Sequence, residues 1–138
     1  MVYDINYLAV SVAAVVSMGL GALWYSPMLF GKQWMALSGL SSEKMDAMKA
    51  KGMTTGYAVG FVGSLVMAYV LAHFVQIAGA TDISGALQLG FWVWLGFVAT
   101  VMLGAVLWEG KSWNLYFLNA GYHLVSLLIM SSILTLWV

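Results

Sequence analysis

The chain has 138 residues, of which 63% are hydrophobic and 7% are charged, against about 25% charged residues in an ordinary soluble domain. Five acidic residues balance five basic ones, all of them Lys, so the formal net charge is zero. These few polar side chains cannot cover the surface of a soluble domain, which excludes a soluble enzyme and a disordered tail. A neutral chain without Arg also lacks the charge to bind nucleic-acid phosphates. We therefore expect a lipid bilayer, and no nucleic acid, as its partner.

Four apolar stretches are long enough to cross a bilayer as helices, which takes about 20 residues. Runs such as SLVMAYVLAHFV do not alternate between apolar and polar positions, as the strands of a membrane barrel do. The sequence therefore predicts an all-α, integral membrane four-helix bundle that forms a single transmembrane domain over residues 1–138. The expected spans are Ile5–Ser26, Thr55–Ala78, Ala86–Trp108 and Asn114–Trp137.

The first span follows Asp4 and no basic residue, so we interpret it as a retained span and not as a cleaved secretory signal. All five lysines fall in the first and third connections between spans, whereas Asp4 and Asp82 lie on the other side of the predicted membrane. Lysines favour the cytoplasmic side of a membrane. The predicted protein therefore lies in the cell (inner) membrane with both termini outside the cytoplasm.

The first connection, about residues 27–54, starts within an aromatic boundary motif made of Trp24, Tyr25, Ser26 and Pro27. Ser followed by Pro is typical of a helix N-cap and the first helical position, so we expect Ser26 to cap an interfacial helix. Ser41 and Ser42 are expected to cap a second short helix. This amphipathic segment is interpreted either as a solvated linker along the membrane surface or as a site that binds lipid or a partner.

The second span carries a stripe of small residues at every fourth position, and a shorter stripe recurs on the third span. In lipid, close backbone approach and dispersion hold helices together, and Gly in a helix costs about 1 kcal/mol against Ala. The stripes therefore predict helix packing, either within one monomer or between copies in a homo-oligomer. Each four-residue step drifts about 40° around the helix, so one neighbour can use about half of the longer stripe. The helix-packing residues are Gly52, Gly56, Gly60, Ser64, Ala68 and Ala72 on the second span and Gly96, Thr100 and Gly104 on the third.

Polar side chains at membrane depth are the usual markers of function in such helices. The candidate polar path consists of His73, Gln76, Gln88, Asn119 and His123. The two histidines differ in predicted depth by more than about 10 Å within one subunit, too far to share a metal. Each is interpreted either as a neutral imidazole bonded to a carbonyl or as a proton-sensitive switch.

No motif in the sequence supports catalysis. The chain has no Cys, and therefore no disulfide, thiol nucleophile or Cys-based metal site. It also lacks a nucleophile elbow, an HExxH motif and a phosphate-binding glycine loop. We expect a protein that is not an enzyme and that has no cofactor or metal site.

Two segments resemble a known family. GALWYSPMLFGKQWM (21–35) resembles the corresponding segment of the bacterial family called domain of unknown function 1761. The stretch from WLGF (94–97) through LWEGKSWNLYFLNAGYHL (107–124) is similar to that family's second half. The resemblance implies a small four-helix integral membrane protein, and it brings no activity, substrate or site residues.

The sequence thus favours a self-associating, non-enzymatic membrane component. The alternative is a small oligomeric channel or transporter whose helices surround the candidate polar path. The sequence names no substrate, ion or small-molecule ligand for either function.

Overall fold

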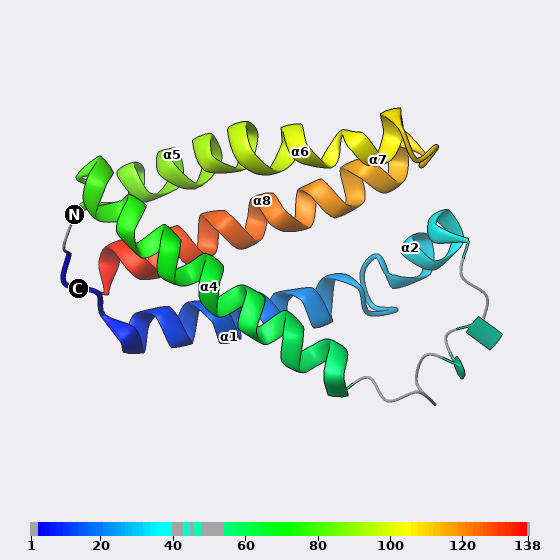
Figure 1. The fold of residues 1–138 in the computed structure, drawn as a ribbon, viewed down its shortest axis with the longest axis horizontal. Helices are drawn as coiled ribbons and strands as arrows, with labels where there is room; N and C mark the ends of the chain where they lie inside the picture. The colour runs from blue at the N-terminus through cyan, green and yellow to red at the C-terminus, as the bar shows by residue number, and fades with distance from the viewer. Residues whose placement is uncertain (1–2, 40–42, 45, 48–53, 138) are drawn as a thin grey trace.

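The computed structural model describes residues 3–39, 43–44, 46–47 and 54–137, and all regular structure in this part of the chain is helical (Figure 1). Four helical segments within these ranges are long and apolar enough to cross a membrane. They are α1 (Tyr7–Trp24), α4 (Thr54–Ala78), the segment Ile83–Leu107 and α8 (Trp113–Leu136). The all-α prediction with four apolar helices is confirmed, and the helix bounds lie within three residues of the expected spans.

The third long segment is not one regular helix. It is built from α5 (Ile83–Val93), the π-helix η1 (Trp94–Ala99), α6 (Thr100–Met102) and α7 (Gly104–Leu107). It begins earlier than expected because the Asp82 side chain accepts a hydrogen bond from the Gly85 amide and so caps the first turn. The π-turns were not visible in the sequence.

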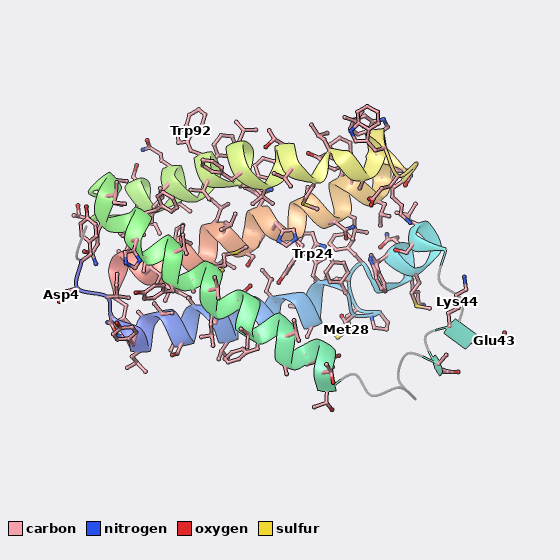
Figure 2. All side chains as sticks on the ribbon, in the orientation of Figure 1. Asp4, Trp24, Met28, Glu43, Lys44 and Trp92 are labelled. Atoms are coloured by element: carbon pink, nitrogen blue, oxygen red, sulfur yellow. The ribbon has the colours of Figure 1, made fainter. Side chains whose placement is uncertain are left out.

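The connections between the helices lie at two opposite ends of the bundle. Both chain ends lie at the same end as the turn between α4 and α5, which we call the terminal end (Figure 1). The short helix α2 (Gly31–Ser38) and the turn between α7 and α8 lie at the opposite end, which we call the lysine end. Asp4 lies at the terminal end and Lys44 at the lysine end, in keeping with the predicted segregation of charge (Figure 2).

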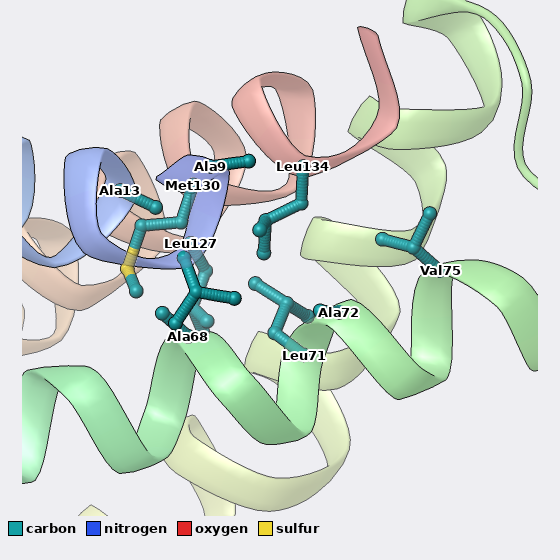
Figure 3. Close-up of a cluster of buried hydrophobic side chains, with 10 residues drawn as sticks. Ala9, Ala13, Ala68, Leu71, Ala72, Val75, Leu127, Met130 and Leu134 are labelled. Atoms are coloured by element: carbon teal, nitrogen blue, oxygen red, sulfur yellow. The ribbon is translucent and has the colours of Figure 1, made fainter. Parts of the chain in front are cut away.

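Helix α8 is the centre of the bundle, because it packs against α1, α4 and α5 and also contacts α2, η1 and α7. Helix α4 crosses α1 and α8 obliquely (Figure 1). The buried core lies where α1, α4 and α8 meet, in the half of the bundle nearer the terminal end (Figure 3). Its members are Ala9, Val10, Ala13, Ala68, Leu71, Ala72, Val75, Leu127, Met130 and Leu134.

Helix α5 packs most closely against α8 at Gly90. A Cβ atom on Gly90 would lie 2.8 Å from the Ser131 Oγ and 3.0 Å from the Leu127 carbonyl oxygen. The Ser131 hydroxyl donates to the Ala86 carbonyl at 2.8 Å, so side chain and backbone join the two helices at the same level. Gly90 was not among the residues predicted to pack helices.

The prediction that Ser26 and Pro27 begin an interfacial helix is wrong. Helix α1 ends at Trp24, a turn follows, and α2 begins only at Gly31. The Ser26 hydroxyl instead donates to the Leu23 carbonyl at 2.6 Å. The last carbonyls of a helix lack partners within it, and the hydroxyl satisfies one of them, so Ser26 belongs to the end of α1.

The turn after α1 requires glycine at its end. A Cβ atom on Gly31 would lie 2.5 Å from the Tyr25 carbonyl oxygen and 2.6 Å from the Ser26 carbonyl carbon. The Gly31 amide also donates to the Ser26 carbonyl at 2.9 Å. The expected cap at Ser41 and Ser42 lies outside the described residues, as does Gly52 of the predicted stripe.

Candidate functional site

A group of polar and aromatic side chains joins α1 to α8 in the half of the bundle nearer the lysine end. The hydroxyls of Ser17 and Ser126 are buried and lie 2.8 Å apart. The Tyr122 hydroxyl donates to the Ser17 carbonyl at 2.9 Å. We call Ser17, Trp24, Tyr25, Asn119, Tyr122 and Ser126 the α1–α8 polar cluster. Because their polar atoms find partners on the facing helix, the cluster fixes the register of α1 on α8.

The two aromatic residues of the boundary motif point into this cluster. The Trp24 Nε1 donates to the Leu118 carbonyl at 3.1 Å, with its side chain directed toward α8 (Figure 2). The Tyr25 hydroxyl donates to the Asn119 Oδ1 at 2.8 Å. Burial, together with a smaller effect of the neighbouring Tyr122 phenol, raises the pKa of Tyr25 to about 12. Tyr25 therefore keeps its proton and remains a hydrogen-bond donor.

Helix α2 rests on the same aromatic residues. The Trp24 and Phe30 rings lie 4.7 Å apart and the Tyr25 and Trp34 rings 5.6 Å apart, measured between centroids. A groove of about 610 Å³ runs between α2 and α8 and is lined mainly by apolar side chains, with Gln33 and Asn114 at its polar positions. Trp24 and Tyr25 of the boundary motif therefore contact both α2 and α8 and connect these two helices to α1.

The π-helix η1 is also fixed to α8. The Trp94 Nε1 donates to the Ala120 carbonyl, and the Tyr116 hydroxyl donates to the Ala99 carbonyl, both at 2.8 Å. The π-turns interrupt the regular α-helix, and Tyr116 gives the Ala99 carbonyl at their end a hydrogen-bond donor from α8.

Within the described residues, the glycines of the shorter stripe predicted on the third span do not approach another helix. A Cβ atom on Gly96 would find no atom within 4 Å, and one on Gly104 would find only the nearby Trp108 ring. Thr100 is exposed, and its hydroxyl donates to the Gly96 carbonyl within the same segment.

The longer stripe on α4 divides into two parts. Ala68 and Ala72 are buried in the core between α1 and α8, and Ser64 is half-buried. Gly56 and Gly60 are exposed. Among the described residues, a Cβ atom on Gly56 would meet nothing within 4 Å, and one on Gly60 would touch only the tip of the Met18 side chain at 3.8 Å. The division follows from the drift of a four-residue repeat around an α-helix.

The members of the candidate polar path on α4 and α5 bond near the terminal end, His73 and Gln88 within their own helices and Gln76 to the segment before α1. The His73 Nδ1 lies 2.9 Å from the main-chain carbonyl one turn before it. The Gln76 side-chain amide donates to the Asp4 carbonyl. Gln88, on an exposed face of α5, donates to the Ser84 hydroxyl at 3.2 Å.

The members on α8 belong to the α1–α8 polar cluster or border it. Asn119 is the acceptor for Tyr25, and the His123 ring lies 5.0 Å from that of Tyr122. The structure thus divides the five predicted residues between two ends of the bundle. Within the described ranges, no three His, Asp or Glu side chains come close enough to hold a metal ion.

Sequence reasoning missed the hydrogen bonds that join Ser17, Tyr122 and Ser126. A lone Ser in an apolar helix can bond to its own backbone, so neither serine marks a contact by itself. The available signal was the recurrence of small hydroxyl residues at Ser126 and Ser131 on the one long helix that also carries Asn119. Such side chains hydrogen-bond between helices in membranes.

The fold and composition define a small all-helical protein with four apolar helices of membrane-spanning length. The chain matches the family described as "Protein of unknown function (DUF1761)" over residues 8–135, and it belongs to that family. The predicted resemblance is thereby confirmed. No curated protein and no solved structure matches the chain.

Proposed function

We propose that this protein is a non-enzymatic membrane component that self-associates through a glycine face on α4. The face consists of Gly56, Gly60 and Gly63, all exposed. Spacings of four and three residues keep the three Cα atoms within about 60° around the helix. One observation supports the proposal most directly: side chains in the described part of the chain leave all three glycines uncovered, apart from the Met18 tip near Gly60.

A second copy of the chain is the partner that fits this face best. Three glycines in one helix cost about 1 kcal/mol each against Ala, and within the described residues only the Met18 tip comes close to any of them. Val59, Val62 and Val66 flank the face and are exposed. Rigid, branched side chains beside a glycine groove allow two helices to approach closely and gain dispersion contacts.

Association in detergent tests the proposal. We expect the unaltered chain to sediment as an oligomer in a density-matched neutral detergent and Gly60→Leu to sediment as a monomer. Gly19→Leu is the matched control, because Gly19 is exposed on α1 and a Cβ there would meet nothing within 4 Å. Equal masses for the two variants would reject α4 as the interface.

We further propose that the protein lies in the bacterial inner membrane with both termini outside the cytoplasm. The proposal rests on the five lysines, all in the connections of one side. A phosphatase reporter joined after residue 138, which is active only outside the cytoplasm, should be active. A fluorescent protein at the same place that folds only inside should remain dark, and the reverse pattern would invert the orientation.

A further inference from the structure

A cavity of about 790 Å³ opens at the terminal end of the bundle. Its walls come from the segment before α1, the end of α4 with the following turn, and the end of α8. The Gln76 side chain ties the first wall to α4 through the Asp4 carbonyl, and the Asn6 side chain ties it to α8 through the Trp137 carbonyl at 3.3 Å. The volume lies within the range of about 300–1,000 Å³ that is usual for sites of small molecules.

One wall carries an unsatisfied polar group. Thr135 lines the cavity and is 2% exposed, yet its hydroxyl has no hydrogen-bond partner in the described part of the chain. A buried hydroxyl without a partner is costly, and Thr in a helix ordinarily bonds to the carbonyl one turn earlier. The described residues therefore leave the hydrogen-bonding capacity of the Thr135 hydroxyl unused.

The charge of the cavity selects the type of ligand. Among the described residues that line it, Asp4, an exposed residue, is the only one with a charged side chain. The connections at the other end of the bundle contain the described lysines, Lys32, Lys44 and Lys111. The Tyr3 and Trp137 rings also line the cavity, and aromatic faces attract organic cations. An anion would find no positive side chain among the described lining residues.

The deeper lining is apolar. Ala9, Val75 and Leu134 line the cavity and are also members of the buried core. A ligand that fills the site must therefore combine a cationic, hydrogen-bonding end with an apolar body.

We propose that this cavity binds an amphipathic primary amine. Its ammonium group lies against the Asp4 carboxylate and the flanking aromatic rings, its apolar body lies along the core wall, and the Thr135 hydroxyl provides a hydrogen bond. The aminoethyl headgroup of a phosphatidylethanolamine and a free lipophilic amine share this chemistry. The site is separate from the glycine face of α4, and its test does not depend on association.

Calorimetric titration of the full chain in neutral detergent tests the proposal, with octylammonium as the probe and 1-octanol as its uncharged counterpart. We expect octylammonium to bind at least 10-fold more tightly than octanol. Asp4→Asn should remove that difference. Asp82→Asn is the matched control, because it removes the same charge at the same end while Asn still caps α5. It should change the affinity less than twofold.

A second variant distinguishes a binding role of Thr135 from a structural one. Thr135→Val keeps the shape and removes the hydroxyl, so octylammonium should bind about fivefold more weakly. The ligand-free variant should melt at the same temperature as the unaltered chain or higher, because a buried unsatisfied group is gone. Tighter or unchanged amine binding in Thr135→Val would show that the Thr135 hydroxyl does not bond to the ligand.

The source of the amine is distinguished by competition. Displacement of octylammonium by phosphatidylethanolamine, and not by phosphatidylglycerol with the same acyl chains, assigns the site to lipid. Failure of both lipids to displace it assigns the site to a free amine. Equal binding of octylammonium and octanol, or equal effects of Asp4→Asn and Asp82→Asn, would overturn the proposal.

Discussion

On α5, a Cβ atom at Gly90 would lie 2.8 Å from the Ser131 Oγ, whereas on α4 a Cβ atom at Gly63 would meet no atom within 4 Å. Both glycines lie within long apolar helices. The difference is their position relative to α8, the helix at the centre of the bundle. Gly90 is required by a contact within the chain, and Gly63 is available for a contact between chains. The role of a glycine in such an apolar helix therefore depends on which helix, if any, packs against it.

The largest expected effect is at Gly90. Gly90→Ala places a methyl group against the Leu127 carbonyl and the Ser131 hydroxyl, so α5 must move away from α8. We expect a loss of about 1–3 kcal/mol in the free energy of unfolding, measured in mixed micelles of neutral detergent and dodecyl sulfate. Gly19→Ala, in open space, is the control. Equal stability of the two variants would contradict the close approach of α5 and α8.

A smaller effect is expected where α8 meets α1. Ser126→Ala removes the 2.8 Å contact with the Ser17 hydroxyl and should cost about 1 kcal/mol, within the range measured for hydrogen bonds between membrane helices. The same unfolding measurement checks it. Ser132→Ala is the control, because the Ser132 hydroxyl donates to the Leu128 carbonyl of its own helix. If Ser132→Ala costs as much, the α1–α8 polar cluster does not hold the helices together.

The smallest effect, of opposite sign, is expected at Gly63. Gly63→Ala introduces no contact within the chain and removes the helix penalty of glycine, so the diluted monomer should gain up to about 1 kcal/mol in stability. Unfolding is measured at protein concentrations low enough to suppress association. A loss of stability comparable to that of Gly90→Ala would show that the face of α4 is already occupied within the chain.

Composition and periodicity were sufficient to predict the four apolar helices. A hydrocarbon environment requires long apolar segments, and each of them stands out from a chain with so few charges. The starts of α5 and α8 depend on the local caps Asp82 and Ser112, whose side chains accept hydrogen bonds from the Gly85 and Leu115 amides. Ser26 was misassigned because the same hydroxyl can serve the helix before it or the helix after it.

Contacts between distant segments could not be predicted. Gly90 faces Ser131, and Ser17 faces Ser126, and no periodicity links positions so far apart in the chain. The α4 stripe was visible as a repeat, but the repeat alone did not show that its alanines face the core and its glycines do not. The candidate polar path was divided for the same reason. The depth of a residue along a helix can be counted from the sequence, but the direction in which its side chain points cannot.

Cysteine cross-linking in the membrane tests the glycine face most directly. The chain has no Cys, so a single introduced thiol reports only contacts between copies. We expect Gly56→Cys to form a covalent dimer on mild oxidation, because paired glycine faces bring Cα atoms within the roughly 4.4–6.8 Å that a disulfide spans. Gly19→Cys should remain monomeric under the same conditions. A monomeric Gly56→Cys, or a dimer that forms equally well from Gly19→Cys, would contradict association through α4.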